Sequence, residues 1–238
     1  MNSIEDAILK LDGRLSGSEL RYVFLGGSVL SLLITDPSAA PIRVTKDVDV
    51  MVNVRTRKDF RAAERRLEAL GFRHDTRDNA PICRWIYEDV TIDVLPIRQE
   101  VLGWNSRWFE DAIASPMTIA CSGRSIHVVS APYFVALKLD AFEERGGRDF
   151  LASTDFEDVI CLFNGRNTIV EEIASCTQIR DVLASRFSSY LKVSELEDAI
   201  DGFVQTETEP DVRKKCILER FAEVARYSEA TQSGARRA

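Results

Sequence analysis

The sequence is poor in the residues that build metal–sulfur sites and disulfide frameworks. Its five cysteines are scattered with no Cys-x-x-Cys pair, and its two histidines, His74 and His127, are isolated in the chain. This pattern excludes a zinc finger or ribbon. An odd cysteine count without a secretory signal indicates reduced thiols, so we expect a cytoplasmic protein. The sequence also contains no Walker loop and no Ser-His-Asp pattern.

Positive charge and long apolar runs are also scarce. The formal net charge is −7, which argues against a general nucleic-acid coat protein but leaves room for a local basic patch. The longest apolar run, residues 22–34, is too short to cross a bilayer and contains two adjacent glycines. We therefore expect no membrane partner. At 238 residues with 45% hydrophobic side chains, the chain can bury one large core or two smaller ones.

The hydrophobic pattern changes near Ser130. Before this point, strands are expected at 22–25, 45–54, 72–75, 82–87, 90–95 and 125–129, and helices at 4–15, 28–34 and 57–70. After it, helices are expected at 133–144, 155–164, 168–175, 179–191, 195–203 and 211–227. The sequence thus predicts an α/β (α+β) protein, with a mixed sheet flanked by helices in residues 1–130 and an all-helical domain in 131–230. We expect residues 231–238 to form a disordered tail.

Two aspartates one residue apart in a valine-rich strand are the strongest chemical signal. Side chains at positions i and i+2 of a strand point to the same side, so Asp47 and Asp49 present their carboxylates together. Aspartate is depleted in strands, and two adjacent carboxylates resist joint ionisation unless a cation lies between them. Oxygen-only ligands suit Mg²⁺. The pattern therefore predicts a Mg²⁺ site, with Mn²⁺ as the alternative ion.

A tight turn precedes this strand. Gly26, Gly27 and Ser28 lead from an apolar strand into an apolar helix, which Ser28 is placed to cap. Backbone N–H groups at a helix N-terminus bind anions. A plain structural alternative is a turn that only requires positive φ angles. An anion site beside a divalent metal site is the combination that phosphoryl or nucleotidyl transfer requires.

Together these residues resemble the polymerase-β-like nucleotidyltransferase superfamily, and most closely its AbiEii-type (MenT-like) members, which are associated with toxin–antitoxin pairs. The resemblance covers residues 22–165, and the C-terminal third of the chain carries none of it. Thr154 departs from the pattern, since a basic residue usually precedes the first aspartate of the downstream pair. The matching residues are Gly26, Gly27 and Ser28 in the turn, Arg43, Thr45, Asp47 and Asp49 in the Arg-x-Thr-x-Asp-x-Asp motif, Asp93 as the third carboxylate, Lys138 as the helical lysine, and Asp155 and Asp158 as the downstream Asp-x-x-Asp pair.

The resemblance implies an enzyme that moves an NMP from an NTP to a hydroxyl of a tRNA or a protein and releases pyrophosphate. It implies that Asp47, Asp49 and Asp93 hold the metal, with Asp93 also serving as general base. Lys138 would be catalytic and would bind the triphosphate. The nucleotide would further contact Gly26, Gly27, Ser28, Asp155 and Asp158. An antitoxin protein is the implied partner.

Several of these residues have plain structural alternatives. Lys138 could lie with its stem along an apolar helix face and its ammonium group in water. Asp155 and Asp158 could be first-turn acids that the helix dipole favours. The basic stripe of Arg57, Arg61 and Arg65 could contact RNA phosphates, but a solvated helix face is the commoner role.

Two other functions share these motifs. A small-molecule nucleotidyltransferase of the antibiotic-modifying kind would use the same catalytic residues with a different acceptor pocket. A non-catalytic nucleotide-binding or partner-binding module could use the same fold without the reaction. The complete set of Asp47, Asp49 and Asp93 favours an enzyme.

Overall fold

The computed structural model describes residues 4–103, 106–144, 147–204 and 210–235, with the side chains of the last range placed as far as Tyr227. The chain forms two compact units, and each is built from two stretches of sequence. The first unit comprises residues 1–29 and 44–130, and the second comprises residues 30–43 and 131–238. The second unit therefore includes a segment, 30–43, that precedes the Asp-x-Asp strand in the sequence.

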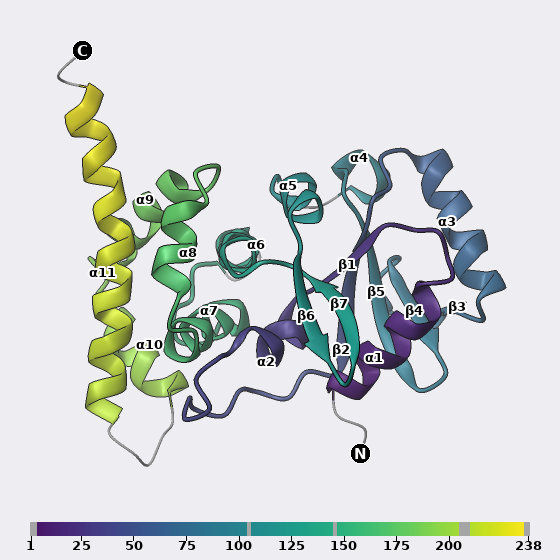
Figure 1. The fold of residues 1–238 in the computed structure, drawn as a ribbon, viewed down its shortest axis with the longest axis horizontal. Helices are drawn as coiled ribbons and strands as arrows, with labels where there is room; N and C mark the ends of the chain where they lie inside the picture. Colours follow the sequence, from purple (N-terminus) through teal and green to yellow (C-terminus); the bar gives the residue numbers. More distant parts are fainter. Residues whose placement is uncertain (1–3, 104–105, 145–146, 205–209, 236–238) are drawn as a thin grey trace. The chain divides into compact units, whose positions relative to one another are not determined.

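The first unit is built on a seven-stranded mixed sheet with the strand order β3-β4-β5-β2-β1-β7-β6 (Figure 1). The neighbours β2 and β5 are parallel, as are β1 and β7, and the remaining pairs are antiparallel. This is the mixed sheet that the sequence predicts. Its strands are β1 (Tyr22–Leu25), β2 (Asp47–Val52), β3 (Arg73–His74), β4 (Arg84–Tyr87), β5 (Val90–Pro96), β6 (Met117–Cys121) and β7 (Arg124–Val128).

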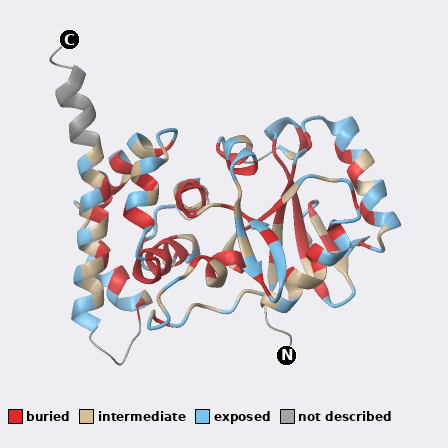
Figure 2. Ribbon diagram, in the orientation of Figure 1, coloured by how far each residue is buried: buried red, intermediate tan, exposed pale blue. Residues whose placement is uncertain are grey.

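The centre of this sheet forms the core of the first unit. In β2, Val48 and Val50 are fully buried, whereas the alternating residues Asp47 and Asp49 are only half-buried. Burial colouring shows β1, β2 and β5 largely buried and the outer strand β6 partly exposed (Figure 2). The edge strand β6 was not predicted from the sequence. Its segment is short and only partly apolar, and few of its residues are buried.

The first unit also contains helices, some of which were predicted from the sequence and some of which were not. Helix α1 (Ile4–Leu15) has the predicted bounds and buries Ile8 and Leu11. Helix α3 (Arg57–Ala69) begins after Thr56, whose hydroxyl oxygen accepts a hydrogen bond from the Asp59 N–H. The short helices η1 (Gly27–Val29), α4 (Gln99–Leu102) and α5 (Phe109–Ala114) complete the set; α4 and α5 were not predicted.

The second unit is helical. Aromatic rings fill part of its core: Phe142 lies 4.9 Å from Phe156 and 5.9 Å from Tyr190, ring centre to ring centre. The final helix is described as far as Ala235, so it includes residues 231–235 of the expected tail; residues 236–238 lie outside the described residues. The helices are α2 (Leu30–Leu33), α6 (Ala131–Glu144), α7 (Thr154–Gly165), α8 (Ile169–Ser175), α9 (Arg180–Tyr190), α10 (Leu196–Phe203) and α11 (Pro210–Ala235).

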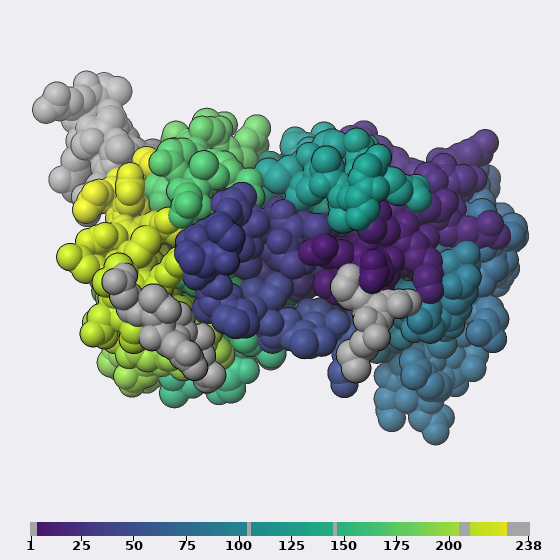
Figure 3. Space-filling view, turned by 60° about the horizontal axis from the view of Figure 1, so that its bottom comes forward, coloured from purple at the N-terminus to yellow at the C-terminus, as the bar shows by residue number. Residues whose placement is uncertain are grey.

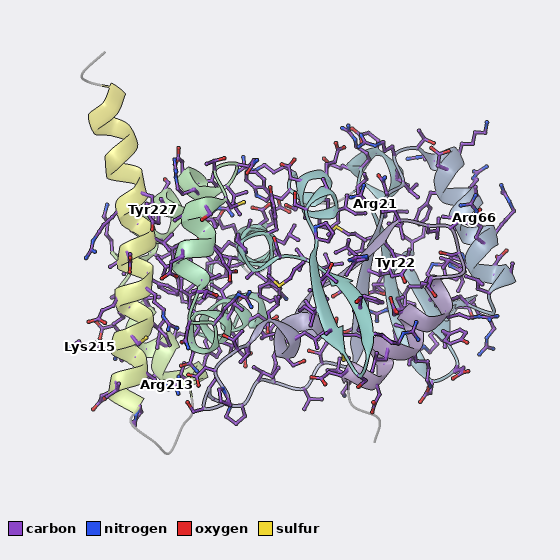
Figure 4. The ribbon with its side chains drawn as sticks, viewed as in Figure 1. Arg21, Tyr22, Arg66, Arg213, Lys215 and Tyr227 are labelled. Carbon is purple, nitrogen blue, oxygen red and sulfur yellow. The ribbon has the colours of Figure 1, made fainter. Side chains whose placement is uncertain are left out.

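The segment 30–43 is fixed within the second unit by hydrogen bonds. The backbone N–H groups of Thr35 and Asp36 both donate to the Gly165 carbonyl at the end of α7, at 2.8 and 2.9 Å. Arg213 of α11, labelled in Figure 4, donates to Asp36 Oδ2 at 2.7 Å and to Ser38 Oγ at 2.7 Å. In the space-filling view of Figure 3, the dark blue atoms of this segment lie beside the yellow atoms of α11. This segment is therefore tied to both α7 and α11.

Within the described ranges, no helix combines the length and the apolar character needed to cross a membrane.

Candidate functional site

Three aspartates lie on two neighbouring strands of the first unit. Strands β2 and β5 are parallel, and Asp49 is the direct register partner of Asp93. Asp47 lies two residues before Asp49 on β2, so it shares the same side of the strand. Asp93 is buried, with 9% of the residue exposed, while Asp47 and Asp49 are half-buried. The structure thus brings together the three carboxylates that the sequence singles out.

The glycine turn lies directly against this group. Gly26 follows β1, whose last residue, Leu25, pairs with Asp49. Gly26 has a φ of +73°, and a Cβ atom built on it would lie 1.9 Å from Asp49 Oδ2. Only glycine therefore fits at this position, for its backbone conformation and because the carboxylate occupies the space of a side chain.

The rest of the turn continues into η1, which contains Gly27 and Ser28. Ser28 is fully buried, and its hydroxyl donates to the Leu25 carbonyl at 3.0 Å. No capping bond from Ser28 appears among the described contacts, so the expected helix cap is replaced by a bond that closes the turn.

Arg84 completes the group, and the sequence predicted no role for it. This residue begins β4 and is the register partner of Asp93 on β5. Its Nε and Nη2 donate to the two Asp93 carboxylate oxygens at 2.8 and 2.7 Å. The same Nη2 donates to Asp47 Oδ2 at 2.9 Å. The sequence signal was an arginine at the start of an otherwise apolar strand.

The donor set fits a hard divalent cation. Three carboxylates on adjacent strands offer only oxygen ligands, which is the chemistry that Mg²⁺ and Mn²⁺ prefer. Asp47 and Asp93 already converge on one positive group, the Arg84 guanidinium. With Arg84 between Asp47 and Asp93, the three carboxylates are not themselves arranged as a metal-holding group, and the described part of the chain contains no other such group of three or more His, Cys, Asp or Glu side chains.

A second charged cluster lies within the helical unit. Lys138 of α6 lies 2.9 Å from Asp155 Oδ1 and 2.6 Å from Asp158 Oδ2, both on α7. Arg43, from the segment 30–43, donates through Nε and Nη2 to the two Asp158 oxygens at 3.1 Å each. The structure therefore joins the helical lysine to both aspartates of the downstream pair, and adds Arg43 to them.

The centre of this helical cluster is buried. The Asp158 side chain is 1% exposed and that of Lys138 is 11% exposed. Burial alone would lower the pKa of Lys138, but the adjacent carboxylates of Asp158 and Asp155 outweigh it, so the pKa is raised. Burial raises the pKa of the neighbouring Glu157 carboxyl. Lys138 is thus a buried ammonium between acids, which differs from the alternative of a lysine whose head group lies in water.

The aromatic residues of β4 and the basic stripe of α3 have ordinary structural surroundings. Trp85 is fully buried and stacks on His74 with ring centres 3.6 Å apart. Tyr87 packs on Phe72 at 4.7 Å. On α3 the basic side chains Arg57, Arg61 and Arg65 are exposed, as a solvated helix face would be.

No protein-family model matches the sequence, and no curated protein matches it. Among solved structures, it is similar to an antigenic nucleotidyltransferase-like protein from Paracoccidioides brasiliensis, with a TM-score of 0.51 and 18% identity over 90% of this chain and 93% of that chain. Similarity at this level of identity establishes the fold. The chain therefore has a nucleotidyltransferase-like α/β fold with a helical C-terminal part.

Proposed function

We propose that the protein is a Mg²⁺-dependent nucleotidyltransferase that moves an NMP from an NTP to a hydroxyl acceptor. The observation that carries this proposal is the position of Asp49. It is the register partner of Asp93 on the neighbouring strand, and its carboxylate lies so close to Gly26 that no side chain fits at that glycine. The nucleotidyltransferase-like fold supports the same class of reaction. Carboxylates beside a glycine turn suit this chemistry because positioning and charge neutralisation carry most of it.

In the proposed reaction, the acceptor oxygen attacks the α-phosphorus. The new bond joins that oxygen to the α-phosphorus, and the bond from the α-phosphorus to the bridging oxygen breaks, so pyrophosphate leaves with the electron pair. Asp93 would take the hydroxyl proton as general base. Asp47, Asp49 and Asp93 would hold Mg²⁺ or Mn²⁺, which when bound neutralises phosphate charge.

The resemblance to AbiEii-type enzymes supports a more specific version of this proposal. It favours a tRNA or a protein as the acceptor, an antitoxin protein as a partner, and a cytoplasmic setting. It also assigns Lys138 to the triphosphate, with Asp155 and Asp158 as nucleotide-binding residues. Within the second unit, Lys138 forms ion pairs with those two aspartates. It would have to break these ion pairs in order to contact phosphate.

The direct test is transfer of label from each α-³²P-labelled NTP, with Mg²⁺, to total cell RNA or to lysate protein. We expect one macromolecule to become labelled in a Mg²⁺-dependent way. Asp49→Ala should abolish labelling while circular dichroism shows a folded protein. Asp78→Ala removes an exposed aspartate of the same unit and should leave labelling unchanged.

The outcomes separate the alternatives. Labelling of a small cationic compound, and of no macromolecule, would indicate a small-molecule enzyme. Nucleotide binding without release of pyrophosphate for any NTP and acceptor would indicate a non-catalytic module. Full activity in Asp49→Ala would refute the metal assignment.

A further inference from the structure

The Arg84 guanidinium lies where the proposed site needs a cation. Its Nη2 is 2.7 Å from Asp93 Oδ2 and 2.9 Å from Asp47 Oδ2, so one nitrogen bridges the two strands. The Arg84 Nε donates a second hydrogen bond to Asp93, to Oδ1 at 2.8 Å. Paired N–H bonds to one carboxylate form the strongest and most directional arginine contact.

The burial of these groups makes the contact different from a surface ion pair. The Arg84 side chain is 24% exposed and that of Asp93 is 12% exposed, whereas the Asp47 side chain is 40% exposed. The fork to Asp93 is therefore shielded from water, and the single bond to Asp47 lies on the accessible side. Partly buried pairs are screened less by water and salt than exposed ones. The bond to Asp47 is thus the weaker of the two and the one that an incoming ion reaches first.

Electrostatics require a positive charge at this position. The aspartates bring three carboxylates to adjacent positions of two strands, and like charges at that spacing repel. An arginine guanidinium stays charged at every physiological pH, so Arg84 brings a full positive charge to Asp93 and Asp47. Arg84 thus neutralises part of the negative charge in the protein without metal.

We propose that Arg84 is a built-in counter-ion, which a divalent cation displaces from Asp47 and which then donates to a phosphate of the bound nucleotide. The inference rests on the proposed function, because it assumes that these aspartates bind metal. Arginine suits this exchange, since its planar fork matches carboxylate and phosphate alike. Metal and nucleotide would then bind cooperatively: the cation takes the Asp47 oxygen, and the triphosphate gives the released guanidinium a new partner.

The test is the affinity for Mn²⁺ alone, measured by the electron paramagnetic resonance signal of the free ion. Arg84→Gln removes the competing charge, so we expect Mn²⁺ to bind about tenfold tighter or more than in the unaltered protein. Arg77→Gln is the matched control, because Arg77 is an exposed arginine of the same unit that pairs with Asp75. This control should leave Mn²⁺ affinity unchanged. Equal or weaker binding in Arg84→Gln would overturn the inference and make Arg84 a positioning residue for Asp93.

The nucleotide arm tests the second half of the inference. With Mn²⁺ saturating, we expect Arg84→Gln to bind a non-hydrolysable NTP about tenfold more weakly, because it lacks the guanidinium. Unchanged nucleotide affinity would overturn this half. Mn²⁺ binding in neither protein would overturn the proposed function itself, along with the inference. Binding in the unaltered protein with no tightening in Arg84→Gln would overturn the inference alone.

A measurement on the unaltered protein guards against a variant that does not fold. The guanidinium N–H signals of Arg84 can be followed by ¹⁵N NMR and assigned by their loss in Arg84→Lys. Saturating Mg²⁺ should shift these signals and speed their exchange with water, since one hydrogen bond is lost. Signals that do not move under saturating Mg²⁺ would contradict the displacement, whatever the variants show.

Discussion

Gly26→Ala tests the close approach of the glycine turn to Asp49. Two costs add in this variant. An alanine held at a φ of +73° costs about 1 kcal/mol or slightly more. The added Cβ would lie 1.9 Å from Asp49 Oδ2, so the carboxylate or the turn must move, and forced overpacking of this kind costs about 1–3 kcal/mol. We expect the free energy of unfolding to fall by about 2–4 kcal/mol.

Gly123→Ala is the matched control. Gly123 lies in the turn between β6 and β7 at a φ of +79°, and a Cβ there would meet nothing within 4 Å. It therefore carries only the backbone cost of about 1 kcal/mol. Urea unfolding followed by circular dichroism gives both values, and Mn²⁺ titration shows whether Asp49 still binds.

The comparison of the two glycine variants tests whether Gly26 closely approaches the Asp49 carboxylate. Gly26→Ala should lose both more stability and more Mn²⁺ affinity than Gly123→Ala. If the two variants lose the same stability and both keep full Mn²⁺ affinity, the turn does not press on the carboxylate, and our reasoning about this position is wrong.

Three further predictions concern the rest of the chain. Lys138→Met should lower the free energy of unfolding by about 3 kcal/mol or more, because it leaves buried carboxylates without their ammonium partner; urea unfolding measures this, and Lys138→Met/Asp158→Asn should recover part of the loss. Hydrogen bonds from Ser38 and Arg213 lower the pKa of Asp36 from 3.8 to about 2, so the contribution of Asp36 to stability is complete above pH 3.8 and is lost as the pH falls through 2. Ser38→Ala should therefore make the melting temperature fall less steeply over this pH range, and an unaltered slope would contradict this prediction. Burial raises the pKa of the Cys83 and Cys161 thiols to about 12, so a thiol reagent at pH 8 should modify neither before unfolding, as mass spectrometry would show.

Periodicity and turn residues were sufficient to predict most of the fold. Helix α1 has the predicted bounds, and the predicted strand 45–54 contains β2, because alternating valines define one buried face. Helices of the second unit begin and end within a few residues of their predicted positions, apart from the longer α11. The edge strand β6 and the short helices α4 and α5 were missed because tertiary contacts stabilise them more than local pattern does.

The residues of the candidate site were predicted more completely than their bonds. The i and i+2 spacing of Asp47 and Asp49 fixes their common side. The sequence predicted an anion-binding turn at Gly26 and Gly27 but not the close approach of Gly26 to the Asp49 carboxylate. Sequence spacing contains no information about register between strands, and register is what pairs Asp93 with Arg84. The bond from Arg43 to Asp158 joins residues far apart in the chain, so no local pattern could reveal it.

The most direct test of the central claim is diffraction from crystals grown with Mn²⁺ and a non-hydrolysable NTP. The anomalous signal locates the ion without assumptions about its ligands. We predict a peak bonded to carboxylate oxygens of Asp47, Asp49 and Asp93, with the triphosphate beside Gly26 and Gly27. A nucleotide bound elsewhere, or a manganese peak away from these aspartates, would contradict the account.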